Sequence, residues 1–185
     1  MRQYLRQRIY TGLLFSNGHT TLKLYQIDAF TNAAFGGNPA AVCLLEKDQP
    51  EPWMRAVAAE MNLSETAFLR PDLDPISIRY FTPEAEIPLC GHATLASAHA
   101  LWSEGLVPRE KEIRFLAPGG QLSCRAEGDW IYMNFPALPA TACDCPADLL
   151  AAIGIDPLSA HIKTAAHPCY LLEFAAEEQV RALAP

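Results

Sequence analysis

The stretch that decides the fold is PLCGHATLASAHALWSEG, residues 88–105, where an apolar strand pattern gives way to a helical one. Small residues recur along this predicted helix at helical spacing, at Ala93, Ala96, Ser97 and Ala100. A face of small side chains lets other backbone segments approach closely, so we expect the rest of the domain to surround this helix. Gly105 is typical of a residue that ends a helix.

Strand patterns precede and follow this helix. We expect strands over residues 22–28, 40–45, 64–70, 76–82, 113–116, 121–126 and 130–135, and a second helix over residues 51–63. The stretch APGGQL at 117–122 indicates a hairpin turn. Together these elements predict an α+β fold in which a curved, mostly antiparallel sheet wraps around the central helix.

The two ends of the chain differ from this central domain. Residues 1–22 contain no acidic residue, and we expect a loosely attached N-terminal extension rather than a targeting peptide. The stretch PALPATACDCP at 136–146 predicts a linker. After it we expect a helix at 147–153, strands near 162 and at 170–174, and a helix at 175–183. The predicted organisation is an extension (1–22), a first domain (23–136), and a linker with the incomplete start of a second domain (137–185).

Composition and charge argue against several classes of function. Half of the residues are hydrophobic and 19% are charged, as in a packed globular protein. The net charge of −7 argues against nucleic acid and anionic membranes as partners. No apolar run approaches the roughly 20 residues that span a bilayer. The six cysteines follow no disulfide-rich spacing, so we expect buried, reduced thiols and a cytoplasmic location.

Glu65 is the first candidate for a catalytic role. In an extended LSETAFL segment, Leu63, Glu65, Ala67 and Leu69 point to the same side. A carboxylate in an otherwise apolar row is costly unless it is paired or reaches a cleft, where it could act as a base toward carbon. The alternative is an ordinary glutamate in solvent at the end of a strand.

The helix start offers a second set of candidate groups. The backbone amides of Gly91, His92, Ala93 and Thr94 would be the unpaired donors of the first turn, which suit a substrate carboxylate. His92 can transfer a proton in the neutral pH range, so Glu65 and His92 form a plausible base and acid. The alternative is a capped turn in which His92 only bonds the backbone.

Other kinds of site have less support. We expect no metal site, because His92 and His99 lie two helical turns apart, about 10 Å, too far for one zinc ion. Cys90 stays open as a nucleophile or proton carrier: a helix start lowers a thiol pKa, whereas the nearby Glu84 and Glu86 would raise it. The sequence contains neither a phosphate-binding loop nor a dinucleotide fingerprint, so we expect no cofactor.

Three motifs in order resemble one known family. YQIDAFTNAAFGGNPAAVCLL at 25–45, NLSETAFL at 62–69 and RYFTPEAEIPLCGHATLASAHAL at 79–101 are similar to the PhzF-like proteins of phenazine biosynthesis. That family is related in fold to diaminopimelate epimerase. The resemblance implies two pseudo-symmetric domains around a cleft, and cofactor-independent isomerisation or epimerisation of a small carboxylate substrate.

The resemblance also implies roles for individual residues. Glu65 would be the general base, His92 would assist or return the proton, and the backbone at Gly91 and Ala93 would hold the substrate. Asn38 would face the cleft, and Cys90 would have no catalytic role. Family members are longer and carry a second-domain motif that does not occur here, so we expect exposed apolar surface and a homodimer. The alternative is a catalytically silent domain that binds a small acid or self-associates.

Overall fold

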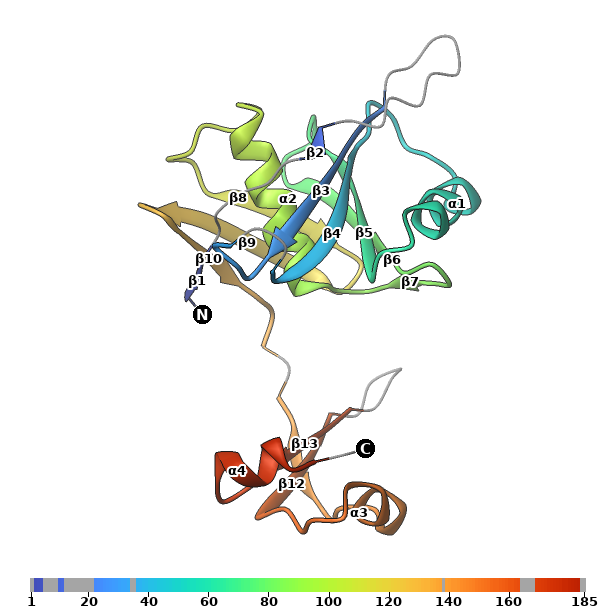
Figure 1. Ribbon diagram of the computed structural model, residues 1–185. Helices are drawn as coiled ribbons and strands as arrows, with labels where there is room; N and C mark the ends of the chain where they lie inside the picture. The colour runs from blue at the N-terminus through green and yellow to red at the C-terminus, as the bar shows by residue number, and fades with distance from the viewer. Residues whose placement is uncertain are drawn as a thin grey trace. The chain divides into compact units, whose positions relative to one another are not determined.

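Figure 1 shows the computed structural model, which describes residues 2–4, 10–11, 22–33, 36–137, 139–163 and 169–183. The chain divides into two compact units, residues 1–136 and 137–185, and each is described by itself. Among the described residues, no helix has both the length and the apolar character that crossing a bilayer requires.

One large mixed sheet forms the framework of the first unit. Its described strands are β1 (Arg2–Tyr4), β2 (Tyr10–Thr11), β3 (Lys23–Ala29), β4 (Asn38–Leu44), β5 (Glu65–Arg70), β6 (Ile76–Phe81), β7 (Glu86–Ile87), β8 (Ile113–Ala117), β9 (Gly120–Glu127) and β10 (Trp130–Asn134). Their order is β1-β10-β9-β8-β6-β5-β4-β3-β2, and β7 pairs with β6 outside this path. The pairs β4–β5 and β6–β8 are parallel and the others are antiparallel. The predicted α+β fold with a mostly antiparallel, curved sheet is therefore confirmed.

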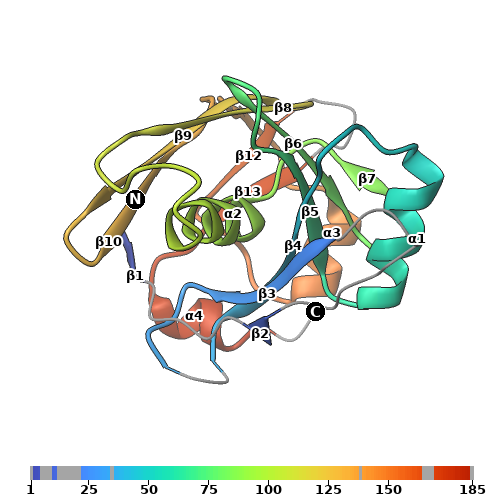
Figure 2. The same ribbon diagram turned by 90° about the horizontal axis from the view of Figure 1, so that it is seen from above.

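Two helices make the crossovers that parallel strands require. Helix α1 (Glu51–Met61) connects β4 to β5, and helix α2 (Gly91–Ser103) lies between β6 and β8 in the chain. Figure 2 shows the strands of the sheet curving around α2, while α1 lies on the opposite side of β4 and β5. The two helices thus cover opposite faces of one sheet.

Helix α2 is enclosed by the sheet, as its small residues predict. Every residue from His92 to Trp102 is buried, and its apolar residues belong to one core cluster with side chains of β3–β6 and β8–β10. Buried hydroxyls in the helix bond internally: Thr94 Oγ1 donates to the Cys90 carbonyl at 2.6 Å, and Ser97 Oγ donates to the Ala93 carbonyl at 2.7 Å. A polar group at this depth needs such a partner, because burying it alone costs free energy.

A second, smaller core lies between the sheet and α1. Met54 and Ala58 of α1 belong to a cluster that includes Phe68 of β5 and Phe81 of β6. The ring of Phe68 meets that of Phe81 edge-on, with centroids 5.6 Å apart. Strands β3–β6 therefore each contribute buried apolar residues to both the core around α2 and the core beneath α1.

The second unit contains a three-stranded sheet and two short helices. Its described elements are β11 (Thr141–Cys143), α3 (Ala147–Ile153), β12 (Ser159–Lys163), β13 (Cys169–Glu173) and α4 (Glu177–Arg181), and the strand order is β11-β12-β13. The prediction of a plain linker at 136–146 is wrong at β11, which pairs antiparallel with β12. Three residues are too few to show an alternating pattern, so only the pairing partner reveals this strand.

The second unit buries little of its apolar surface. Among its described residues only Ala160 is buried, whereas Leu158, Tyr170, Leu171 and Val180 are exposed. The prediction of buried thiols also fails here. Of the six cysteines, only Cys43, Cys90 and Cys124, all in the first unit, are buried, whereas Cys143 and Cys145 are partly exposed and Cys169 is exposed.

The predicted extension, residues 1–22, is described only at Arg2–Tyr4, Tyr10–Thr11 and Leu22. The first two segments are β1 and β2, which pair with β10 and β3. The remainder of the extension lies outside the described residues, so its loose attachment stays a prediction.

Thr66 provides a test of polar burial in the sheet. Its side chain is fully buried on β5, and Oγ1 has no hydrogen-bond partner among the described residues. We expect Thr66→Val to raise the free energy of unfolding by about 1 kcal/mol, because it removes an unpaired hydroxyl. Urea denaturation measures this change.

The matched control is Thr94→Val. Thr94 is equally buried, but its Oγ1 lies 2.6 Å from the Tyr80 hydroxyl and also bonds a backbone carbonyl. This change should therefore lower the free energy of unfolding. A Thr66→Val protein that is destabilised as much as Thr94→Val would contradict the assignment of an unpaired hydroxyl.

Burial of His99 on α2 should make the stability of the first unit fall at acidic pH. Burial, aided by the charge of Arg109, lowers the pKa of His99 from 6.5 to about 4. Below pH 6.5 the unfolded chain therefore binds a proton that the folded chain does not, so stability falls as the pH falls from 6.5 toward 4. The loss reaches up to about 3 kcal/mol for this residue. Urea denaturation across this range should show a shallower decline for His99→Gln than for the wild type, and equal slopes would refute the assignment.

Candidate active site

Glu65 and His92 meet where the first turn of α2 faces the beginnings of two parallel strands. Glu65 is the first residue of β5 and pairs in register with Ala40 of β4, and His92 is the second residue of α2. The distance from His92 Nε2 to Glu65 Oε2 is 3.1 Å, with side-chain exposures of 8% and 18%. The two residues that the sequence singles out as base and acid are therefore in contact.

The Glu65 carboxylate is poorly satisfied for a group at this depth. Oε2 is buried and accepts no aligned hydrogen bond from the described residues, although His92 Nε2 lies within ion-pair distance. Ala67 and Leu69 follow it on the same side of β5, and both are fully buried in the core around α2. Glu65 thus lies at the end of a row of buried apolar side chains rather than in open solvent. Its buried Oε2 keeps a lone pair that can accept a proton.

The surroundings of His92 favour the neutral form of its ring. Its burial lowers the pKa of the imidazole below the usual value, and the charge of Glu65 only partly opposes this effect. The ring hydrogen bonds go to side chains rather than to the backbone, with Cys90 Sγ 3.3 Å from Nδ1 and Ser64 Oγ 3.3 Å from Nε2. The structure therefore contradicts the alternative in which the His92 ring bonds only the backbone of the turn.

Asn38 reaches the site through a serine that the sequence analysis missed. Ser64 Oγ lies 3.5 Å from Asn38 Oδ1 and 3.3 Å from His92 Nε2, so its hydroxyl bridges the two. Ser64 directly precedes Glu65 in the motif NLSETAFL. Nothing in its spacing separates it from an ordinary turn residue, and only the meeting of β4, β5 and α2 gives it a role.

Phe30 forms an apolar neighbour of His92. Its ring meets the imidazole edge-on, with centroids 6.5 Å apart, and the side chain is 44% exposed. The backbone of Phe30 has φ 63°, in the left-handed region that a bulky residue rarely adopts. An exposed aromatic side chain thus lies beside the candidate acid.

The N-terminus of α2 leaves backbone donors unpaired within the helix. Cys90 is the N-cap residue with an extended backbone, and no side chain caps this end by a hydrogen bond. The amides of Gly91, His92 and Ala93 precede the first intrahelical bond, which Thr94 N donates to the Cys90 carbonyl. With the positive end of the helix dipole, these amides suit a carboxylate ligand next to Glu65 and His92.

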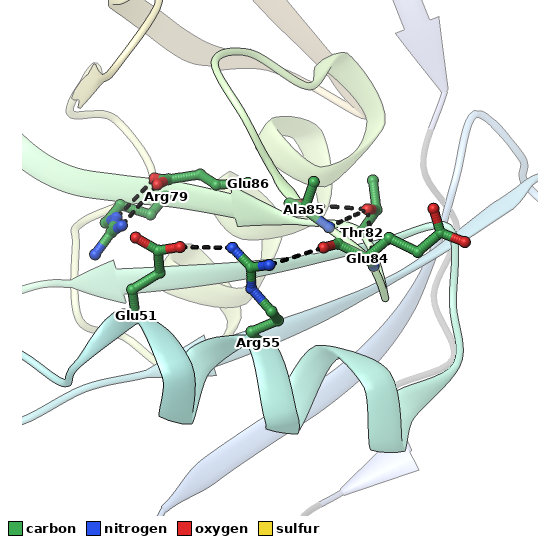
Figure 3. Close-up of polar contacts among 7 residues, drawn as sticks. All are labelled: Glu51, Arg55, Arg79, Thr82, Glu84, Ala85 and Glu86. Atoms are coloured by element: carbon green, nitrogen blue, oxygen red, sulfur yellow. Dashed lines mark hydrogen bonds and ion pairs between the residues drawn. The ribbon is translucent and has the colours of Figure 1, made fainter.

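The loop before α2 is tied to α1 (Figure 3). Thr82 Oγ1 accepts hydrogen bonds from the amides of Glu84 and Ala85 at 3.2 and 2.9 Å. Arg55 of α1 donates to the Glu84 carbonyl at 3.1 Å and pairs with Glu51 one helical turn away at 2.6 Å. The turn that leads toward His92 therefore has a fixed backbone conformation.

Two further contacts hold the same segment. Arg79 of β6 donates to both carboxylate oxygens of Glu86 at 2.7 and 2.6 Å, as Figure 3 also shows. Gly119, in the turn between β8 and β9, donates its amide to the Pro88 carbonyl at 2.8 Å. Because a Cβ at position 119 would lie 2.7 Å from the Pro88 carbonyl oxygen, only glycine permits this approach.

Cys90 does not have the environment of a nucleophile. Burial raises the pKa of its thiol to about 11, which outweighs the lowering expected at a helix start. At neutral pH the sulfur therefore keeps its proton. His99, on the same helix, bonds Ser103 Oγ at 3.2 Å and takes no part in the site.

Glu65, Cys90 and His92 each place one donor atom within 4.8 Å of the others. The sulfur, however, approaches Nδ1 of the ring, whereas the carboxylate approaches Nε2. One ion can bind only one of these nitrogens, and a thiolate ligand would require deprotonation of a thiol with a raised pKa. The sulfur and the carboxylate therefore lie beside different nitrogens of the ring, which is not the arrangement of a preformed metal cage.

Comparison with known proteins shows the family. The family model described as phenazine biosynthesis-like protein (PhzC-PhzF) matches residues 27–185. This chain belongs to that family. A protein of Halalkalibacterium halodurans named an uncharacterized isomerase is 45% identical over 166 residues, which are 89% of this chain and 62% of the relative. The phenazine biosynthesis-like domain-containing protein 2 of Mus musculus is 47% identical over 127 residues, 64% of this chain and 43% of the relative.

Solved structures agree with the fold. The crystal structure of a PhzF family protein from Enterococcus faecalis has a TM-score of 0.73 and 37% identity, and the match covers 88% of this chain and 60% of that one. A protein described as a predicted epimerase from Pseudomonas aeruginosa has a TM-score of 0.66 at 24% identity, with 86% and 61% covered, which shows the fold alone. The chain spans about three fifths of the length of the first of these relatives.

A substitution at Gly91 can test whether a glycine is required there for stability or only for ligand binding. A Cβ at Gly91 would meet only Phe135 Cζ, at an ordinary 3.7 Å. We expect Gly91→Ala to keep the free energy of unfolding or to raise it by up to about 1 kcal/mol. Gly119→Ala, whose Cβ would collide with Pro88, should lower it by about 1–3 kcal/mol.

Thermal and urea denaturation measure both Gly→Ala variants. A Gly91→Ala protein as unstable as Gly119→Ala would show that the helix start itself requires glycine. With stability retained, any loss of ligand binding in Gly91→Ala reports crowding at the first-turn amides.

Proposed function

We propose that the first unit carries the base and acid of an isomerase or epimerase that moves a proton at carbon in a small carboxylate substrate. The contact between Glu65 Oε2 and His92 Nε2 at the N-terminus of a buried helix carries this proposal. A proton acceptor, a proton donor and a set of carboxylate-binding amides then lie within one site.

Each group has a defined part in the proposed reaction. Glu65 Oε2, with its free lone pair, removes the proton from the carbon next to the substrate carboxylate. The negative charge that develops moves onto the carboxylate oxygens, where the first-turn amides of Gly91, His92 and Ala93 stabilise it. His92 assists or returns the proton through Nε2, and Asn38 orients Ser64. Because these side chains supply both base and acid, the reaction needs no cofactor.

The family supports the reaction class. The relative from Halalkalibacterium halodurans and a relative from Pseudomonas aeruginosa, 42% identical, are both named as isomerases, although uncharacterized. The matched part of this chain covers 62% of the first of these relatives, so catalysis by these 185 residues alone is part of the proposal.

A second candidate function is self-association without catalysis. It is favoured by the exposed Leu158, Tyr170 and Leu171 of the second unit. Light scattering coupled to size-exclusion chromatography tests it: a homodimer is expected, and a monomer at all concentrations would remove this candidate.

Solvent deuterium exchange tests the catalytic proposal. We expect the chain to catalyse exchange at an acidic C–H of at least one compound in a panel of small amino and hydroxy carboxylates, followed by NMR. Glu65→Gln should lower the rate by about 10²–10⁴-fold, because the amide cannot accept the proton.

Glu84→Gln is the matched control. This exposed glutamate lies on the turn before β7, and its carbonyl, not its carboxylate, bonds Arg55. Its rate should equal that of the wild type. Exchange that is catalysed by the wild type and survives in Glu65→Gln would refute Glu65 as the base. No exchange with any compound, from this chain or from a two-domain relative, would refute the proposed reaction.

A further inference from the structure

We infer that Cys90 is a positioning residue, which donates its S–H to His92 Nδ1 and thereby holds the imidazole proton on Nε2, the nitrogen that faces Glu65. The importance of this tautomer rests on the proposed proton transfer. The tautomer itself is a property of the free protein and can be observed without a substrate.

The geometry leaves each ring nitrogen with its own neighbours. Nδ1 lies 3.3 Å from Cys90 Sγ, and Nε2 lies 3.1 Å from Glu65 Oε2 and 3.3 Å from Ser64 Oγ. Cys90 and His92 are 6% and 7% exposed, so solvent has little access to exchange one arrangement for another. The protonation of the ring is therefore decided by these three side chains.

Electrostatics distinguishes the two neutral tautomers. With the proton on Nδ1, the lone pair of Nε2 would face a carboxylate oxygen at 3.1 Å, and two negative regions would be in contact. The Nδ1 proton would then have only a sulfur as acceptor, which is a weak one. With the proton on Nε2, the N–H lies beside the carboxylate and Nδ1 accepts the S–H. Ser64 donates its single hydroxyl proton to Asn38 Oδ1, so toward Nε2 it can only accept a hydrogen bond, which also favours a proton on Nε2.

Burial keeps both groups in the form that this arrangement requires. The pKa of the Cys90 thiol is raised to about 11, so the S–H persists at neutral pH, and the pKa of His92 is lowered, so the ring is neutral. A neutral imidazole carries a single proton, and its location decides whether the ring can donate on the side of Glu65. Cys90 thus acts through His92 and not on the substrate.

The backbone explains why a residue at position 90 can do this. Cys90 is the N-cap of α2 and has an extended backbone, with φ −143° and ψ 119°. This conformation places its thiol beside a ring that belongs to the second residue of the helix. The orienting group and the ring are therefore fixed to the same helix end, which is itself buried.

Long-range ¹H–¹⁵N NMR of the full 185-residue chain tests the inference, because ring nitrogens with and without a proton have well-separated shifts. The His92 signals are assigned by their loss in His92→Gln. At pH 7.5 we expect Nε2 to show the protonated shift and Nδ1 the unprotonated one. Cys90→Ala should move both shifts toward each other, as the two tautomers mix.

Two variants make the result specific. Cys90→Ser retains a donor and should preserve the wild-type shifts. Cys124→Ala removes another buried thiol of the same core and should leave the His92 ring unchanged. Circular dichroism confirms that each variant folds.

The inference is overturned by a proton on Nδ1 in the wild type, or by a Cys90→Ala spectrum that matches that of Cys124→Ala. It is also overturned if addition of ZnCl₂ or EDTA to the purified chain changes the His92 shifts, since the cluster would then be a metal site. If the wild type and its variants show the expected shifts but no protein, including a two-domain relative, catalyses deuterium exchange, the proposed reaction is refuted and the tautomer assignment stands.

Discussion

The enclosure of α2 is the constraint on which the rest of the structure depends. Because this helix is buried on all sides, its polar side chains must find hydrogen-bond partners, which explains the internal bonds of Thr94 and Ser97. Its alanines leave room for the strands that pack closely around it. The same enclosure fixes the ends of the helix. Its N-terminus opens where β4 and β5 begin, and this is why Glu65, His92 and the first-turn amides come together.

The parallel pairing of β4 with β5 brings two strand beginnings to the candidate site. In a purely antiparallel arrangement, neighbouring strands begin at opposite edges. Because α1 returns the chain before β5 starts, Asn38 and Glu65 begin adjacent strands at one edge. The contacts of Arg55 and Arg79 then fix the loop that leads from this sheet into α2. Ordinary packing on both faces thus supports a small polar site.

Much of this could be predicted from the sequence, because the strong signals are local. The small residues of α2 indicated a buried helix, and the row from Leu63 to Leu69 indicated a partly buried Glu65. What could not be predicted depends on partners that are distant in the sequence. The strand β11 exists only through β12, and Ser64 contacts His92 only once the fold brings them together. The sequence likewise left the Cys90 thiol open between a lowered and a raised pKa, and burial, which depends on the whole fold, raises it.

The crossover that places α2 inside the sheet also determines when the site can form. The strands that enclose this helix come from both before it, β3–β6, and after it, β8–β10. During synthesis the helix and its apolar side chains therefore stay without part of their cover until about thirty further residues, up to the end of β10, have been made. Such non-local closure folds slowly compared with a helical bundle. The candidate site, whose residues lie between Asn38 and Ala93, therefore gains its complete enclosure only after strands β8–β10 have been added.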